Sequence, residues 1–263
     1  MLQFPEIEGA IFDLDDTLLD NGPIDRPIEW LHARSRLAAI HEAAETHGIH
    51  ELRELTPEEN LAAFHTATTH SSRGAVWNAL YVKGLIADKD IDPEHPLYGL
   101  VVEISDRKDQ LHEPILREFG IEIPGASHFI QTLALNGLSN HLALATSAIQ
   151  RDIDIFLDKY QLHDMFPPER IISAEKVTKH KPDPECFDLA FRSLGLPEKS
   201  RKKVLAFEDN PRGIASAKAA GLFVCAITSR FAADSPVMLA AQPDLIANSY
   251  DEFAEKLQIP FSS

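Results

Sequence analysis

The chain has 263 residues, of which 44% are hydrophobic, and it carries a formal net charge of -16 at pH 7. This length and composition suffice for one large domain or two modest ones, and they exclude a disordered tail protein. The acidic balance without a basic run argues against nucleic-acid and membrane partners, because both present anionic surfaces. No stretch approaches about eighteen consecutive apolar residues, and the first residues do not resemble a secretory signal. We therefore expect a cytoplasmic protein.

The first predicted element is a short buried strand that runs into a group of acids in "IFDLDDTLLD", residues 11–20. Asp13 and Asp15 are two residues apart, so at a strand end their side chains project toward the same side. Such carboxylates repel each other unless a cation lies between them, and Mg²⁺ is a hard ion that oxygen ligands favour. In phosphoryl transfer, one carboxylate could attack phosphorus while the other protonates the leaving oxygen. A solvated turn with chance acids would also explain the pair taken alone.

The region from residue 22 to 122 is predicted to be an inserted helical domain. Its helical patterns cover residues 30–48, 56–70 and 106–120, and we find no convincing strand among them. Segments rich in Pro and Gly, "DNGPIDRP" and "GIEIPG", lie at its two ends and suit hinges. Within it, Arg73 precedes a helix and could reach an anionic group of a substrate, although a solvated surface arginine is an equally good interpretation.

Three more short apolar runs that end in polar residues are predicted as buried parallel strands. They cover residues 141–147, 202–209 and 221–228. Helical patterns between them begin at Pro184 and Asn210. Strands alternating with helices predict a doubly wound, Rossmann-like parallel α/β sheet, whose sites lie beyond the carboxyl ends of the strands. The predicted architecture is a core of residues 1–21 and 123–263 with a helical cap of residues 22–122.

Polar groups that suit a phosphoryl centre end the later strands or precede a helix. Thr146 and Ser147 end the second apolar run and offer a hydroxyl and backbone N–H groups to a phosphate oxygen. Lys181, in "KHKPDPECF", precedes a helix whose N-terminus favours anions. Glu208 and Asp209 end the "VLAF" run and add oxygen ligands for a cation. Because charge lies on the equatorial oxygens of a phosphoryl group, an ammonium and a cation around it are the expected partners.

Four motifs in this order resemble those of the haloacid dehalogenase (HAD) superfamily. They are "DLDDT", "ATS", "HKPDP" and "FEDNPRGIASAKAAGL". The chain is identified as similar to subfamily I with a helical C1 cap, and to its phosphoglycolate phosphatases and β-phosphoglucomutase-like phosphatases. The likeness covers residues 11 to about 226 except the cap, which matches only in helical character.

The resemblance implies roles for the motif residues. Asp13 would be the nucleophile that forms an aspartyl-phosphate, and Asp15 would act as general acid and then as general base. Thr146, Ser147 and Lys181 would bind the phosphoryl group, with Thr146 and Lys181 counted among the catalytic residues. The expected activity is hydrolysis of a phosphomonoester, and the expected partner is a small phosphorylated metabolite.

The resemblance also implies a magnesium site. In the family, Mg²⁺ is bound by positions that correspond to the Asp13 carboxylate, the Asp15 backbone carbonyl and the Asp209 carboxylate. Glu208 would help directly or through water, and Thr17 would brace the loop.

Single positions distinguish the chemistries of the superfamily. Dehalogenases lack a carboxylate at the position of Asp15, and phosphonatases usually have Ala there, so this residue argues against both. The β-phosphoglucomutase type has His twelve residues after the nucleophile and Lys three residues after the second-motif hydroxyl. This chain has Asp25 and Ile149 at those positions. Both departures argue against mutase activity and favour hydrolysis of a phosphomonoester, with a sugar phosphomutase kept as the alternative.

Two readings from other classes remain open. A receiver-type phospho-switch also combines clustered acids, Thr and Lys on a doubly wound sheet, but it does not need a helical insertion of about a hundred residues. A catalytically silent member that binds a metabolite would usually have lost a motif carboxylate or the lysine, and none is missing here. We expect a monomer or a homodimer.

Overall fold

The computed structural model describes residues 2–4, 6–69 and 71–260. They group into two compact units, one made of residues up to Asp20 and from Ile121 onward, the other Asn21–Gly120. We call these the sheet unit and the helical unit. The boundaries expected from the sequence, after residues 21 and 122, lie one and two residues further along the chain.

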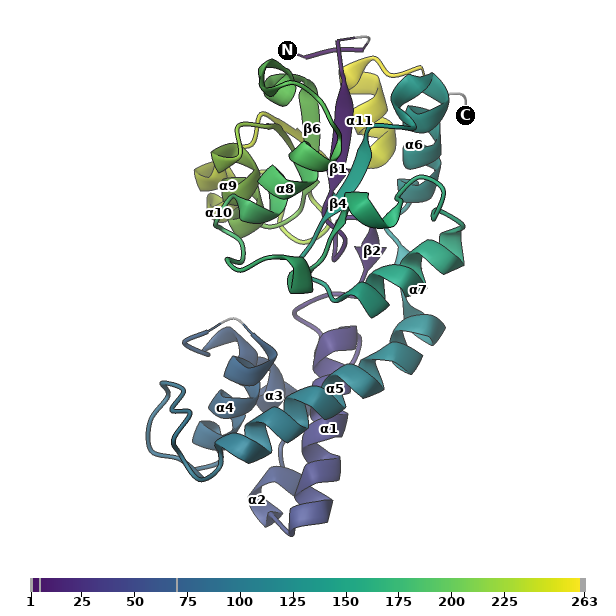
Figure 1. The fold of residues 1–263 in the computed structure, drawn as a ribbon. Helices are drawn as coiled ribbons and strands as arrows, with labels where there is room; N and C mark the ends of the chain where they lie inside the picture. The colour runs from purple at the N-terminus through teal and green to yellow at the C-terminus, as the bar shows by residue number, and fades with distance from the viewer. Residues whose placement is uncertain (1, 5, 70, 261–263) are drawn as a thin grey trace. The chain divides into compact units, whose positions relative to one another are not determined.

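The described part of the sheet unit is built on six parallel strands in the order β5-β4-β1-β6-β7-β8 (Figure 1). Their bounds are β1 Gly9–Phe12, β4 Leu142–Ala145, β5 Ile171–Ile172, β6 Val204–Glu208, β7 Phe223–Ile227 and β8 Leu245–Ala247. Nearly all strand residues are buried, as in a parallel sheet that is covered on both faces. The predicted doubly wound α/β fold is confirmed, and β4, β6 and β7 lie inside the ranges expected for them.

Helices cover the two faces of this sheet. They are α6 Ala126–Leu133, α7 Gln150–Tyr160, α8 Glu185–Ser193, α9 Pro211–Ala219, α10 Pro236–Ala241 and α11 Tyr250–Leu257, with a π-turn Ala134–Leu138 and 3₁₀ turns Pro168–Arg170, Ala174–Lys176 and Glu198–Lys203. In Figure 1, α8, α9 and α10 lie on one face, and α6 and α11 on the other. On the second face, Phe12 and Phe207 stack with 4.7 Å between ring centroids, and Phe253 packs edge-on against Phe207 at 5.1 Å. Burial of these large side chains fixes the sheet on which the site is built.

The regular elements in the described part of the helical unit are all helices. They are α1 Leu31–His47, α2 His50–Arg53, α3 Pro57–His65, α4 Ser72–Val82 and α5 Tyr98–Phe119. Thr56 and Glu59 form a capping box that starts α3. The pattern expected to continue to residue 70 ends as a helix at His65, and residue 70 lies outside the described residues. No helix in the described ranges has the length and apolar character needed to cross a bilayer.

A two-stranded ladder stands where the chain passes between the units. Strand β2, Leu19–Asp20, pairs antiparallel with β3, Ile121–Glu122, with Leu19 opposite Glu122. The expectation of no strand up to residue 122 is therefore wrong at β3. A strand of two residues is too short to show the alternation by which strands are found in a sequence.

Candidate active site

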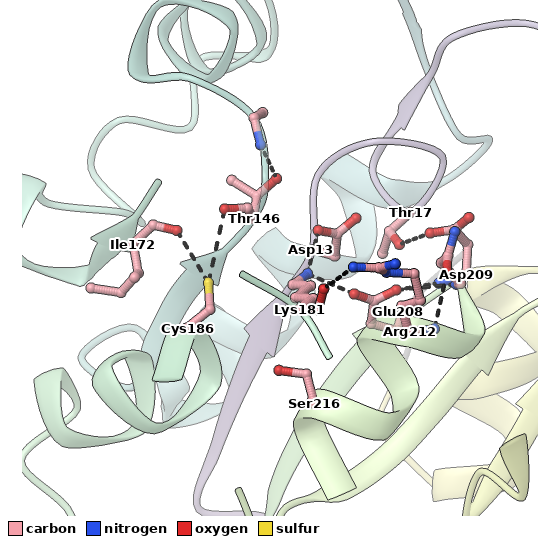
Figure 2. Close-up of polar contacts among 12 residues, drawn as sticks. Asp13, Thr17, Thr146, Ile172, Lys181, Cys186, Glu208, Asp209, Arg212 and Ser216 are labelled. Atoms are coloured by element: carbon pink, nitrogen blue, oxygen red, sulfur yellow. Dashed lines mark hydrogen bonds and ion pairs between the residues drawn. The ribbon is translucent and has the colours of Figure 1, made fainter. Parts of the chain in front are cut away.

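The carboxyl ends of the central strands β4, β1 and β6 bring the predicted polar side chains to one edge of the sheet (Figure 2). Asp13 follows β1, Thr146 follows β4, and Glu208 ends β6 with Asp209 after it. Lys181 reaches this edge from the segment before α8. The chain passes from β1 to β4 on one side and later returns to β6 on the other. Doubly wound sheets bind ligands at such a switch point.

Lys181 lies between two carboxylates. Its Nζ donates to Asp13 Oδ1 at 2.7 Å and to Glu208 Oε1 at 2.6 Å, and all three side chains are buried. Burial alone lowers the pKa of the ammonium, but the charges of Asp13 and Glu208 outweigh it and raise that pKa above its usual value. Lys181 therefore remains a cation at the strand ends. Glu208, which the sequence predicted only as a metal ligand, also holds this ammonium in place.

Glu208 is held at both oxygens. Its Oε2 accepts the backbone N–H groups of Asp209 and Asn210, each at 3.1 Å, while Oε1 accepts from Lys181. Space for this carboxylate depends on Gly213 in α9, because a Cβ atom at that position would lie 1.6 Å from Glu208 Oε1. The glycine in "EDNPRG" could have indicated this close packing of α9 against Glu208, but it was not used in the sequence analysis.

Three carboxylates form a cluster that suits a metal ion. Asp13, Glu208 and Asp209 each offer an oxygen, and these oxygens lie within 4.8 Å of one another. Asp209 Oδ1 accepts from the Thr17 hydroxyl at 3.3 Å, whereas Oδ2 is buried and has no hydrogen-bond partner among the described residues. Burial, with the nearby charge of Glu208, raises the pKa of Asp209 well above its usual value. A hard divalent cation would satisfy the unpaired oxygen and offset the repulsion, so the residues present fit the expected Mg²⁺.

The Asp13 carboxyl is also perturbed. Its pKa is raised to about 7, with burial as the largest cause; the charges of Glu208 and Asp15 act in the same direction, and that of Lys181 opposes them. Asp15 is half-buried in the turn after Asp13, where its backbone bridges to Leu19. A bound cation would favour the charged form of Asp13, which is the form that a nucleophile requires.

The remaining predicted residues differ in their surroundings. Thr146 is buried, and its Oγ1 accepts the N–H of Ala148 at 3.0 Å, which leaves the hydroxyl proton available to a ligand. Ser147 beside it is exposed. Arg73 belongs to α4 in the helical unit and is also exposed, and its role stays a prediction.

Contacts that were not anticipated hold the loop after β1. Tyr250 donates to the backbone carbonyl of Thr17 at 2.9 Å, and the Ser229 hydroxyl donates to the carbonyl of Asp16. The Arg230 guanidinium lies 3.8 Å from the Asp16 carboxylate. Thr17 does contact Asp209, so the loop carrying the first motif is fastened both to the fourth motif and to the segment after β7.

This site matches a known family. The family model described as "Hydrolase: haloacid dehalogenase-like hydrolase" matches residues 7–221. The chain belongs to the haloacid dehalogenase-like hydrolase family. The resemblance inferred from the four motifs is confirmed.

Relatives within this family include named phosphatases. Glycerol-1-phosphate phosphohydrolase 1 of Saccharomyces cerevisiae is 36% identical over 122 residues, which cover 44% of this chain and 47% of that protein. The match thus spans about half of that relative. Hexitol phosphatase A of Escherichia coli is 26% identical over 246 residues, 93% of this chain and 92% of that protein. The solved structure of CbbY from Rhodobacter sphaeroides in complex with phosphate shares the fold, with a TM-score of 0.65 and 22% identity over 94% of this chain and 96% of that one.

Proposed function

We propose that this family member is a phosphatase, a phosphoric monoester hydrolase that acts on a small phosphorylated metabolite. The observation that carries the proposal is the buried Lys181 ammonium between Asp13 and Glu208, beside the unpaired oxygen of Asp209. A phosphoryl group is suited by a cationic side chain next to a carboxylate cluster that can bind a metal ion, both at the switch point of the sheet. The names of the glycerol-phosphate and hexitol relatives agree with this class of substrate.

The proposed chemistry has two steps. Asp13 attacks phosphorus and forms an aspartyl-phosphate as the ester P–O bond breaks, while Asp15 donates a proton to the leaving alcohol oxygen. Asp15 then takes a proton from a water molecule, whose oxygen attacks the phosphorus, and inorganic phosphate leaves as Asp13 is restored. Acid and base assistance of this kind typically contributes roughly 10²–10⁴-fold in rate. Since Lys181 binds Asp13 Oδ1, we assign the attack to Oδ2.

The remaining side chains stabilise charge on the phosphoryl oxygens. Lys181 offers N–H donors, and Thr146 offers its hydroxyl proton. Mg²⁺, held by the Asp13 and Asp209 carboxylates and the Asp15 backbone carbonyl, would supply further positive charge to those oxygens when bound. Glu208, whose oxygens already accept hydrogen bonds, keeps Lys181 and the chain at Asp209 in place.

The test is phosphate release by the full chain with Mg²⁺ over a panel of phosphorylated sugars, polyols, glycolate, nucleotides and cofactors. Asp13→Asn should lower kcat at least about 10⁴-fold, because it removes the attacking charge and little volume. Asp251→Asn, at an exposed position at the start of α11, is the matched control and should keep full activity.

Two results would overturn the proposal. Release that persists in Asp13→Asn would show that another group attacks phosphorus. No release from any compound by the wild-type chain would reject the phosphatase, and conversion of a sugar phosphate into an isomer without release would establish the phosphomutase instead.

A further inference from the structure

We propose that Arg212 is a positioning residue for Lys181, so that the first turn of α9 controls where the ammonium meets the phosphoryl group. The inference rests on the proposed function, in which Lys181 binds that group. Arg212 lies outside the set of residues that the motifs assign to chemistry. Its Nη2 donates to the backbone carbonyl of Lys181 at 2.6 Å (Figure 2).

The segment that carries Lys181 is held by side chains, among them Glu185, whose carboxylate accepts the N–H groups of Thr178 and Lys179 at 2.9 and 2.8 Å. Residues 177–184 form neither a helix nor a strand, so no regular ladder of backbone hydrogen bonds fixes them. Arg212 binds this segment at the carbonyl of Lys181. Ser216 binds it at the carbonyl of Asp183, to which its hydroxyl donates at 2.6 Å. Positions 212 and 216 are one helical turn apart and share a face of α9, so a single helix face holds the main chain on both sides of Pro182.

The same turn also fixes the other end of the lysine. Gly213, next to Arg212, leaves the space that Glu208 occupies, and Glu208 accepts from Lys181 Nζ. Asn210 caps the helix by accepting the backbone N–H of Arg212 at 3.0 Å, which sets the start of the turn. Backbone and ammonium of Lys181 are therefore both positioned from one helical turn, the first through Arg212 and the second through Glu208.

If this inference is correct, Arg212 affects catalysis only through the position of Lys181, and its variants should show this in kcat and KM. Arg212→Gln removes the long-range donor and should lower kcat about 10- to 100-fold with KM nearly unchanged, because small misplacements of a positioning group have effects of this size. Arg212→Lys, which can still donate one hydrogen bond, should recover part of the loss. Arg192→Gln on α8, at an exposed arginine paired with Asp188, is the control and should change neither constant.

A double-mutant cycle separates positioning from direct contact with the ligand. The rate constant kcat, measured with Mg²⁺, should fall in Arg212→Gln but show no further fall when Lys181 is already replaced by Met. Equal losses in both backgrounds would overturn the inference. So would a rise in KM alone, which would indicate that Arg212 binds substrate itself, or a loss of thermal stability with unchanged kinetics.

A readout that needs no turnover distinguishes this inference from the proposed function. Hydrogen exchange followed by mass spectrometry should show faster exchange in the peptide covering residues 177–184 in Arg212→Gln than in Arg192→Gln. Faster exchange in a chain without phosphatase activity would keep the role of Arg212 in holding this segment and reject the function. Unchanged exchange in an active enzyme would reject the role of Arg212 alone.

Discussion

Two buried cations in this molecule are held in opposite ways. Lys181 in the sheet unit lies between the carboxylates of Asp13 and Glu208, and their charges raise its pKa. Arg36 in α1 of the helical unit is 2% exposed, and among the described residues it has no carboxylate partner. Its Nε donates to the Asn60 side chain at 2.8 Å and its Nη2 to the Asn60 carbonyl at 3.3 Å, and burial lowers its pKa to about 10.

Among the described residues, the other contacts of Arg36 are to neutral aromatic rings. Its guanidinium carbon lies 5.6 Å from the ring centroid of Trp30 and 5.3 Å from that of Phe64. Such contacts stabilise a cation and leave no opposite charge behind when it is removed. Burial alone therefore does not distinguish a cation at the candidate site from one that only holds helices together. Lys181, between carboxylates from distant segments, suits the proposed chemistry, whereas Arg36, bonded to one asparagine, fastens α1 to α3.

The largest effect on stability is expected when Lys181 is replaced by Met. Asp13 and Glu208 would then face each other without a cation, and breaking a buried pair on one side costs about 3–5 kcal/mol. The pKa of Asp13, already about 7, would rise further without the opposing charge. At pH 5 the Asp13 carboxyl binds a proton and its charge no longer repels Glu208, so the deficit should be smaller there than at pH 8. Urea unfolding at both pH values in the presence of a chelator measures this, and an equal deficit at the two would contradict it.

Mg²⁺ should stabilise the sheet unit by satisfying the carboxylate cluster. A ligand at a hundredfold excess over its Kd that binds only the folded state adds about 2.7 kcal/mol to the free energy of unfolding. Asp209→Asn should lose this gain, because it removes the charge next to the unpaired oxygen, whereas Asp251→Asn should keep it. Thermal unfolding with Mg²⁺ and with a chelator is the measurement. Equal stabilisation of both variants would place the cation elsewhere.

Gly213→Ala should disturb the support of Lys181 without changing any charge. The added Cβ would collide with Glu208, and overpacking of a dense interior costs about 1–3 kcal/mol. Gly99 in α5 is a helical glycine at which an added Cβ would meet nothing within 4 Å beyond its own turn of helix. Gly99→Ala should therefore be neutral or gain up to about 1 kcal/mol. Chemical denaturation of the two variants tests the contrast, which fails if both lose the same amount.

Arg36→Met should have a smaller effect than Lys181→Met. It leaves no charge unpaired, but the buried Asn60 Oδ1 loses its donor, and an unsatisfied buried acceptor costs about 1–3 kcal/mol. The deficit should not change between pH 5 and pH 8, and the catalytic constants should stay at their wild-type values. A pH-dependent deficit like that of Lys181→Met would show that Arg36 has an acidic partner after all.

Much of the site could be predicted because parallel strands end at one edge of a sheet. Asp13, Thr146 and Glu208 each follow an apolar run, and that placement needs no knowledge of side-chain packing. The bond between Glu208 and Lys181 could not be read from the sequence, since it depends on how the segment before α8 returns to the sheet. Gly213 and Arg212 were missed for the same reason, because a glycine inside a helix shows its purpose only when its neighbour in space is known.

Several of the elements that escaped prediction are short. Strand β5 has two residues and β8 has three, too few for a hydrophobic pattern to stand out from a loop. In the helical unit, α5 begins at Tyr98, eight residues before the start predicted at residue 106. Its N-terminus has no side-chain cap, so the sequence gives no signal for this start. The sequence suggested that Arg73 precedes a helix, whereas it lies in the first turn of α4. The buried Arg36 lies inside α1 and has no local sequence signature.

The pairing of β2 with β3 makes the hundred residues between them, seen from the sheet, one very long hairpin loop. Closing a loop costs only about 0.6 kcal/mol more for each doubling of its length, so the size of this insertion weighs little on the folding of the sheet. A short turn joining Asp20 to Ile121, or a different inserted module, would leave the register of the central strands unchanged. The helical insertion is therefore attached to the sheet unit at a single junction, between β2 and β3, where its length and content can change without altering the sheet.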